Sequence, residues 1–215
     1  SRQRGALALA LGALHRAVGG MRSQAFLSQS VDLLQQLILD QTSDVHVWSL
    51  HSLWLVINAA GSPFASLAAQ TIAKTHRLLA SAPSYSTPIA YQGIGKVVIA
   101  AMSALGPELT PGQRTFKYCR DVSLCLAEHA QSTILLESLH YHQMLVLFAP
   151  QTVNMAEMVS KFEPYLSNDS VALRTAAVVG LHQLAQLDVR LLSQNDIETK
   201  LFQFYDSEHE KVLQH

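Results

Sequence analysis

The sequence predicts an all-α, right-handed α-solenoid in which antiparallel helix pairs repeat along the chain. Similar segments begin near Leu7, Val47 and Leu173, and their spacing corresponds to a repeat of about 42 residues. No segment alternates apolar and polar residues for long enough to indicate a strand. A repeat of this length, built from two helices, is typical of solenoids, whose stacked units form extended binding surfaces.

Composition supports this fold class and argues against several others. Of the 215 residues, 49% are hydrophobic and 14% are charged, whereas ordinary globular domains have about 25% charged residues. Low charge is expected for helices that pack against neighbours on both sides. The net charge of -1 predicts no general attraction to nucleic acid or to anionic membranes. Because no apolar run reaches the length of a bilayer-spanning helix, no membrane span is expected.

Prolines, glycines and capping residues mark the expected helix boundaries. Three hydroxyl–proline pairs are expected to cap helix N-termini: Ser62-Pro63, Thr87-Pro88 and Thr110-Pro111. Gly61 and Gly106 are expected to end helices, because glycine adopts the left-handed conformation that closes a last turn. About ten helices are expected, over residues 3–18, 24–41, 44–60, 63–81, 87–105, 111–128, 132–148, 152–166, 170–187 and 194–205, and an eleventh from Ser207.

Pairing of these helices predicts one continuous array over residues 1–215, cut from a longer chain. The approximate units are 1–20 (partial), 21–61, 62–106, 107–149, 150–188 and 189–215 (partial). Helix 3–18 is then the second helix of a pair whose first helix is not in the sequence. We therefore expect its free face to be partly exposed.

The histidines and cysteines do not form a recognisable catalytic or metal-binding pattern. Ten histidines are present, but His140 and His142 are two residues apart and so point to different faces of a helix. His51 and His182 recur in second helices and are expected to hydrogen-bond across the groove between repeats. The two cysteines are expected to be reduced thiols of a cytosolic protein. We expect no catalytic, cofactor-binding or metal-binding residues and no cofactor.

A short glycine motif resembles a phosphate-binding loop but lacks its spacing. Gly93-Ile94-Gly95-Lys96 has no Gly-x-x-x-x-Gly-Lys-Ser/Thr pattern and no preceding strand, and it falls in the middle of a predicted helix. Each glycine there costs about 1 kcal/mol of helix stability relative to alanine. The expected reason for this cost is a close approach between helices.

One segment is more basic than the rest of the chain. Between residues 74 and 120 the sequence contains six cations and a single acid, Glu108, which gives a local charge of +5. The residues of this basic zone are Lys74, Arg77, Lys96, Arg114, Lys117 and Arg120. In a solenoid such a zone could bind an acidic peptide or an anionic head group of a partner. The alternative is a solvated surface of uneven composition.

One frame of the repeat runs from Asp169 through Leu173-Arg174, Ala177 and Leu181 to Leu184. This frame resembles the second helix of a HEAT repeat. Five stretches, taken in order, are similar to a family of very large HEAT-repeat proteins. These stretches are Ala8–Met21, Val47–Leu53, Ala104–Leu109, Leu147–Pro150 and Arg174–Ala185. The family is called HEAT repeat-containing protein 5 in animals and the large clathrin-adaptor accessory protein in yeast.

This resemblance implies a non-catalytic scaffold in clathrin-adaptor-dependent vesicle traffic. Members help to recruit or stabilise the adaptor complex on trans-Golgi network and endosomal membranes, so the implied location is cytoplasmic and peripheral to these membranes. The implied partners are the adaptor complex and its accessory proteins, and self-association of the full-length protein is compatible with the resemblance. Two alternatives remain: a HEAT scaffold of another system, such as a nuclear transport receptor or a phosphatase scaffold subunit, and an enzyme with a helical-bundle fold.

Overall fold

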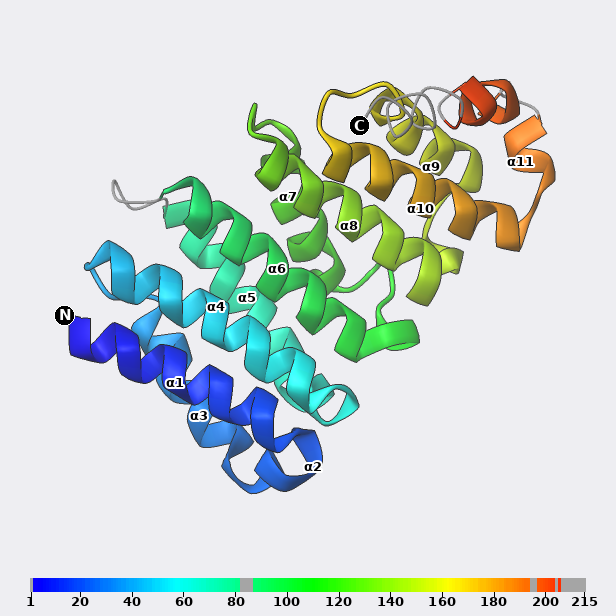
Figure 1. Cartoon of the computed structure of the whole chain (residues 1–215). Helices are drawn as coiled ribbons and strands as arrows, with labels where there is room; N and C mark the ends of the chain where they lie inside the picture. The colour runs from blue at the N-terminus through cyan, green and yellow to red at the C-terminus, as the bar shows by residue number, and fades with distance from the viewer. Residues whose placement is uncertain (1, 82–86, 194–196, 204, 206–215) are drawn as a thin grey trace. The chain divides into compact units, whose positions relative to one another are not determined.

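The computed structural model describes residues 2–81, 87–193, 197–203 and 205 (Figure 1). The chain divides into two compact units, Ser1–Glu137 and Ser138–His215, which are described separately. The boundary falls within α8 (Ser132–Phe148), whose first residues belong to the first unit. The prediction of one continuous array across this boundary stays a prediction.

All regular elements in the described parts of the chain are helical, which confirms the predicted all-α solenoid class. The first unit contains α1 (Arg2–Val18), α2 (Gly20–Ser23), α3 (Leu27–Leu37), α4 (Ser43–Ala60), α5 (Ala65–Ser81), α6 (Pro88–Leu105) and α7 (Arg114–Ala127). Its 3-10 helices are η1 (Gln24–Phe26), η2 (Ser62–Phe64) and η3 (Gly106–Glu108). The second unit contains η4 (Pro150–Thr152), α9 (Met155–Phe162), η5 (Glu163–Tyr165), α10 (Val171–Leu187) and α11 (Arg190–Ser193).

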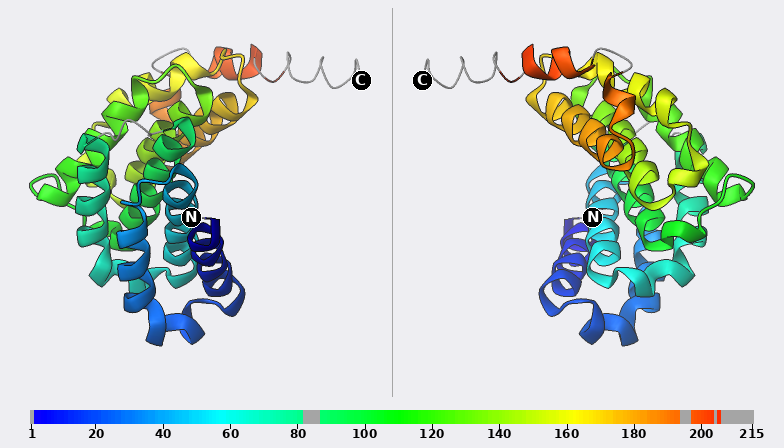
Figure 2. Two further views of the ribbon diagram at one scale, coloured as in Figure 1. Left: turned by 90° about the vertical axis from the view of Figure 1, so that its left-hand side faces the viewer. Right: turned by 90° about the vertical axis from the view of Figure 1, so that its right-hand side faces the viewer.

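The helices of the first unit form two layers. Helices α1, α4 and α6 pack successively against one another, and we call them the inner layer. Helices α3, α5 and α7 form the outer layer, in which α5 contacts α7 and each helix contacts a member of the inner layer. The views in Figure 2 show α1 and α4 on one side of this unit and α3 and α5 on the other. The pairs α3–α4 and α5–α6 lie within the predicted units 21–61 and 62–106.

The core lies between these layers. Helix α4 buries Leu50, Leu53, Val56 and Ile57, because it is covered by its own outer partner and by inner helices on both sides. Trp54 of the same helix is only half-buried, because no described helix of the first unit covers the face of the inner layer that points away from the outer helices.

Helix α1 has the exposure expected of a second helix without its partner. It packs on α4 through small residues, including Ala8 and Gly12, which are buried. On its other faces Leu7 is 70% exposed and Leu14 is 60% exposed. The prediction of a partly exposed first helix is therefore confirmed.

The helix-end predictions are confirmed at the glycines and at one of three capping pairs. Gly61 and Gly106 follow α4 and α6 with φ of 59° and 53°, a region that favours glycine. Thr87 accepts a hydrogen bond from the Ala90 backbone N–H at 3.3 Å and caps α6, with Pro88 at the first helical position. Ser62-Pro63 instead begins the 3-10 helix η2 and makes no side-chain cap.

Thr110-Pro111 was wrongly predicted as a helix start. Helix α7 begins three residues later, at Arg114. The side chain of Gln113 explains the delay, because it accepts from the Thr110 N–H at 3.3 Å and donates to the Glu108 carbonyl at 3.1 Å. These two bonds hold the residues after η3 in a turn.

In the second unit, α9 and α10 form one helix pair. The Arg174 guanidinium donates to the carbonyls of Asn168 at 2.8 Å and Asp169 at 3.0 Å, so this residue of the repeat frame fastens the loop before α10. A Cβ on Gly180 would lie 2.5 Å from the Phe162 ring, so the two helices touch closely. The predicted helix 194–205 is described only at 197–203 and 205, which are helical, and α11 was not predicted. The helix expected from Ser207 lies outside the described residues.

Candidate protein-interaction surfaces

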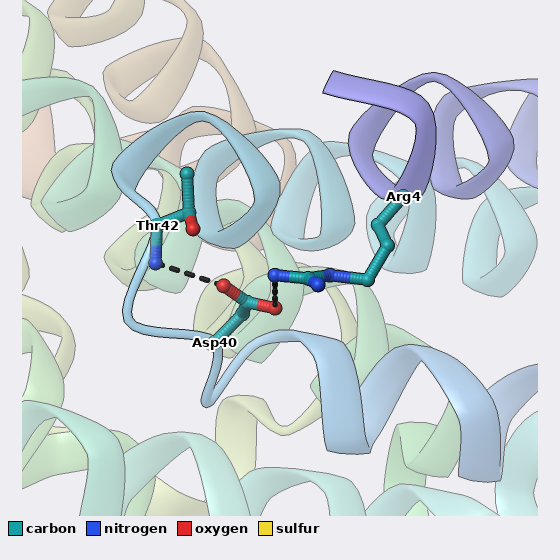
Figure 3. A network of polar contacts seen from close by, with 3 residues as sticks. All are labelled: Arg4, Asp40 and Thr42. Atoms are coloured by element: carbon teal, nitrogen blue, oxygen red, sulfur yellow. Dashed lines mark hydrogen bonds and ion pairs between the residues drawn. The ribbon is translucent and has the colours of Figure 1, made fainter. Parts of the chain in front are cut away.

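The position of α1 is fixed at its N-terminal end by a polar network (Figure 3). Asp40, in the turn between α3 and α4, accepts from the Thr42 backbone N–H at 2.8 Å and pairs with the Arg4 guanidinium at 2.9 Å. The Thr42 hydrogen bond, followed by the Arg4 charge, lowers the pKa of Asp40. The network joins the α3–α4 turn to the first turn of α1.

Close contacts fix the register between the inner helices. A Cβ on Gly12 of α1 would lie 2.7 Å from the Ser52 Cα of α4, so the two backbones approach closely. Gly5 meets Trp48 and Gly12 meets Ser52, which shows that α1 and α4 run parallel. The glycines of α6 behave similarly, since a Cβ on Gly95 would lie 2.7 Å from the Glu137 Cβ. The predicted close approach at the Gly93–Gly95 motif is confirmed.

The uncovered face of the inner layer carries an aromatic and cationic cluster. The Lys96 ammonium of α6 lies 5.5 Å from the centroid of the Trp54 ring of α4, within the range of a cation–π interaction. The His51 ring lies 5.4 Å from the same Trp54 ring, one turn earlier on α4. Asn58, one turn later, donates to the Trp54 carbonyl at 2.9 Å. His51 and Asn58 are exposed, and Trp54 and Lys96 are half-buried.

A small cleft of about 60 Å³ lies between the exposed sides of α4 and α6, beside this cluster. Its lining residues are Val47, Leu50, His51, Trp54, Ile89, Gln92, Gly93 and Lys96. The absence of a side chain at Gly93 helps to open it, because a Cβ there would stand 3.1 Å from Leu50. The cleft can hold the tip of one side chain.

Positive charge converges on His51 from both neighbouring helices. Burial lowers the pKa of His51, and the charges of Lys96 on α6 and Arg16 on α1 lower it further. Arg16 is exposed near the C-terminal end of α1. Three successive inner helices therefore each contribute one basic group to the same region.

The structure separates the six residues of the predicted basic zone. Lys74 and Arg77 lie on α5, in the outer layer, whereas Lys96 lies on α6, in the inner layer. Lys74 is engaged, because its ammonium donates to the Gln35 amide oxygen at 2.5 Å. Together Lys74 and Arg77 line a hollow of about 380 Å³ between α3 and α5.

The other three residues of the zone form a stripe on α7. Arg114, Lys117 and Arg120 are exposed and follow one another at intervals of three residues, so they share one side of the helix. The Arg120 guanidinium lies 3.9 Å from Asp121, which also lies 3.6 Å from the His76 ring of α5. The zone is therefore two outer-layer groups and one inner-layer cation, not one continuous patch.

The histidine predictions are wrong for the two recurring positions. His182 is exposed and shares a hydrogen bond of 3.1 Å with Gln186 on its own helix. The His51 ring lies tilted beside Trp54 of its own helix, and no described hydrogen bond joins it to another repeat. Histidines with a structural role lie elsewhere. His46 is buried and bonds the Ile38 carbonyl at 2.5 Å through Nδ1, and His15 bonds the Ser30 hydroxyl at 2.8 Å.

The chemistry of the remaining polar groups is limited. Among the described residues, no three His, Cys, Asp or Glu side chains converge as metal ligands. Both cysteines are free thiols, and Cys119 is fully buried. Burial raises the pKa of Cys119 to about 12 and also raises that of Cys125. Neither thiol is therefore activated as a nucleophile.

Within the described residues, the stretch Pro88–Glu108 is long and apolar enough to cross a membrane by length and composition. Another stretch qualifies only if α4 and η2–α5, which are bent by 117°, are taken as one span. Half of Pro88–Glu108 is buried within the protein, where α6 packs on α4 and α5. This packing accounts for its apolar composition, as in the core helix of a helical array.

A second surface of interest is an apolar hollow of about 470 Å³ between α1 and α3. Leu11, Leu14, Val18, Phe26 and Leu33 supply most of its apolar lining. The sequence indicated that α1 would be exposed but not that α3 would continue the same apolar surface. The alignment of Arg16, His51 and Lys96 was also missed, because the interval of 35 residues from Arg16 to His51 does not match the repeat.

Sequence comparison relates this chain to a part of a much longer protein. No family model matches the sequence. The chain is similar to Protein SWEETIE of Arabidopsis thaliana, with 32% identity over 209 residues, which are 97% of this chain and 9% of that protein. The chain thus spans less than a tenth of this relative. The name of this relative does not identify the family suggested by the sequence resemblance, so the specific adaptor-accessory family is kept for the proposal below.

Solved structures show the fold alone. An engineered protein determined by the Northeast Structural Genomics Consortium matches with a TM-score of 0.66 and 13% identity, over 93% of this chain and 81% of that chain. A crescerin structure, described as using a TOG domain array to regulate microtubules in the primary cilium, gives a TM-score of 0.39 and 21% identity. It covers 85% of this chain and 69% of that chain, and at this TM-score it carries no argument.

Proposed function

We propose that this chain is a non-catalytic segment of a scaffold that binds partner proteins along its inner helix layer. One observation carries the proposal: the face of α4 and α6 that no other helix of the first unit covers holds an ordered group of His51, Trp54 and Lys96. Half-buried aromatic and cationic side chains of this kind are enriched where proteins bind one another. Stacked repeats hold such groups at fixed spacings.

The non-catalytic part of the proposal is supported by the state of the reactive side chains. The Cys119 thiol is buried with its pKa at about 12, and the His142 ring bonds the Ser138 carbonyl of its own helix at 2.7 Å. These groups are used in packing. A catalytic site would need an accessible base or nucleophile held by a second polar group.

We further propose that the scaffold acts in clathrin-adaptor-dependent vesicle traffic at the trans-Golgi network and endosomes. Its partners would be the adaptor complex and its accessory proteins, and it would be cytoplasmic and held at the membrane through them. This finer proposal is supported by the five sequence stretches, from Ala8–Met21 to Arg174–Ala185, that occur in the same order as in the adaptor-accessory family they resemble. The name of the plant relative adds nothing to it, and the α-solenoid fold supports only the scaffold role.

Affinity purification of the tagged full-length protein from cells tests this proposal. Enrichment of adaptor subunits over a tag-only control is the expected result. Recovery of Ran or of a phosphatase catalytic subunit in their place would assign the scaffold to nuclear transport or to a phosphatase. Proximity labelling of the same protein gives an independent readout, because it reports the organelle as well as the partner.

A second candidate surface is the stripe of Arg114, Lys117 and Arg120 on α7. All three cations are exposed on one side of the helix, so they could attract an acidic partner surface. Replacing Lys117 and Arg120 together by glutamate is expected to weaken capture of that partner. Unchanged capture by the double variant would show that this stripe is an ordinary solvated surface.

A further inference from the structure

We propose that Arg16, His51 and Lys96 form a docking strip for an extended acidic peptide of a partner protein. The strip crosses the inner layer, with one residue on each of α1, α4 and α6. This inference rests on the proposed scaffold function and specifies its binding chemistry. It concerns the inner layer, and not the basic stripe on α7.

The strip is held in place by the packing beneath it. The Gly12–Ser52 contact fixes α1 against α4, and α4 and α6 are in contact along the layer. Lys96 is further oriented by the Trp54 ring, 5.5 Å from its ammonium. A cation held over an aromatic ring loses less conformational freedom on binding than a free lysine does.

The charges of the strip are not neutralised by the acid at the α6–α8 contact. Glu137 is buried, and it accepts a hydrogen bond from Gln92 at 3.4 Å, so it does not line the cleft beside Lys96. Arg16 follows Gly12 by one helical turn, and Gly12 packs against Ser52, the neighbour of His51 on α4. Consistent with this placement, the charges of Arg16 and Lys96 contribute to the lowered pKa of His51, so the two cations flank this ring. A region with two such cations stabilises an anionic ligand.

The spacing of the strip matches an extended peptide that runs across the helices. Packed helices lie about 8–10 Å apart. In an extended chain, side chains at alternate positions lie about 7 Å apart on the same side. Acidic residues two or three positions apart could therefore reach successive inner helices. An apolar side chain between them could enter the 60 Å³ cleft beside Trp54.

The small number of cations favours a peptide over other anionic partners. Anionic lipid surfaces are typically recognised by clusters of about four to eight basic residues. Duplex nucleic acid is bound through about six to ten phosphate contacts. The strip offers two permanent cations, Arg16 and Lys96, and the His51 ring, whose lowered pKa favours its neutral, hydrogen-bonding form. In a chain of net charge -1, this small number of charges suits a short acidic segment.

Fluorescence anisotropy with a labelled octapeptide of alternating glutamate and serine tests the strip on the 215-residue chain. Binding is expected to weaken about twofold to fivefold for Lys96→Gln or Arg16→Gln, and about tenfold for the double variant. A peptide with glutamine in place of glutamate should not bind detectably. The melting temperature of each variant, followed by circular dichroism, should stay within a few degrees of that of the parent chain.

Lys161→Gln and Arg190→Gln are matched controls, because they remove the same charge from exposed positions on α9 and α11, outside both the strip and the stripe on α7. Equal weakening by the control and strip variants would overturn the proposal, since the peptide would then sense only net charge. Loss of binding in the control variants alone would place the peptide site outside the strip and would also overturn it. Phosphatidylserine vesicles are a further competitor. If they displace the peptide from the parent chain, and Lys96→Gln abolishes this displacement, the occupant of the strip is a membrane. That result would also overturn the proposal.

Failure of this inference can be told apart from failure of the proposed function. If Lys96→Gln leaves peptide binding unchanged while adaptor subunits still co-purify with the full-length protein, the docking proposal is contradicted and the proposed scaffold function is retained. If the variant loses the peptide but adaptor subunits never co-purify, the strip stands and the assignment to adaptor traffic is wrong.

Discussion

At the scale of single residues, burial determines the protonation state of two titratable side chains. Cys119 and His46 are both fully buried, and both have pKa values shifted toward their neutral forms. Neither shift could be predicted from the sequence, because the sequence does not tell which side of α7 or α4 faces the core at a given position. Their consequences are directly measurable.

The first consequence concerns thiol reactivity. In a Cys125→Ser variant, the remaining Cys119 should not react with a disulfide reagent such as DTNB at neutral pH, because its pKa of about 12 leaves almost no thiolate. The same variant should react fully in denaturant. Rapid reaction of the native variant would mean that α7 opens to solvent at Cys119.

The second consequence concerns pH and the free energy of unfolding. Burial lowers the pKa of His46 below its unfolded value, despite the opposing hydrogen bond to Ile38, so the folded state binds fewer protons. The stability from neutral His46 is complete above the unfolded pKa of about 6.5 and is lost as pH falls toward the folded pKa. The free energy of unfolding should therefore decrease as the pH is lowered from about 7.5 to about 5.5.

A His46→Asn variant should make this decrease shallower, since asparagine can still donate near Ile38 but does not titrate. The change in slope is expected to be at most about 1.4 kcal/mol per pH unit. His182→Asn is the matched control, because His182 is exposed, and it should keep the slope of the parent chain. Equal slopes for His46→Asn and the parent chain would show that another group causes the pH dependence.

At the scale of the helices, the glycines of α6 show what can and cannot be predicted from sequence. Two glycines in mid-helix predicted a close approach, and the structure confirms one on either side of the helix. Gly95 faces Glu137 and Leu126, whereas Gly93 faces Leu50. Which neighbour each glycine meets depends on helix rotation and register, and these are tertiary properties.

Gly95→Ala is expected to destabilise the chain by about 1–3 kcal/mol in urea unfolding, because its Cβ would stand 2.7 Å from the Glu137 Cβ and 2.8 Å from Leu126 Cδ1. Gly93→Ala should cost less. Its nearest neighbour is 3.1 Å away, and alanine gains about 1 kcal/mol of helix propensity. A larger loss for Gly93→Ala than for Gly95→Ala would contradict the register of α6 against its neighbours.

At the scale of the whole chain, the all-helical class and the order of the long helices in the described residues could be predicted, because apolar periodicity and helix ends record them. The division at Glu137 could not, since it depends on how many contacts cross from one repeat to the next. The docking strip was also hidden, because its three residues come from different helices at unequal intervals. The apolar hollow between α1 and α3 is a further property of assembled helices.

That hollow should bind hydrophobic dyes in the native chain. Leu14→Glu is expected to reduce the fluorescence of bound ANS, because Leu14 lines the hollow and is 60% exposed. The free energy of unfolding should change by less than about 0.5 kcal/mol, as for other surface substitutions. Ala13→Glu, which adds the same charge on an exposed position outside the hollow, should leave the dye signal unchanged.

The chain has two tryptophans, and Trp48 and Trp54 both lie on α4. Intrinsic fluorescence therefore monitors only the first unit, while circular dichroism records helices in both. The two spectroscopic signals give independent denaturation midpoints for one polypeptide. If the midpoints differ, the chain melts in stages, and the tryptophan emission tells at which stage the inner layer comes apart.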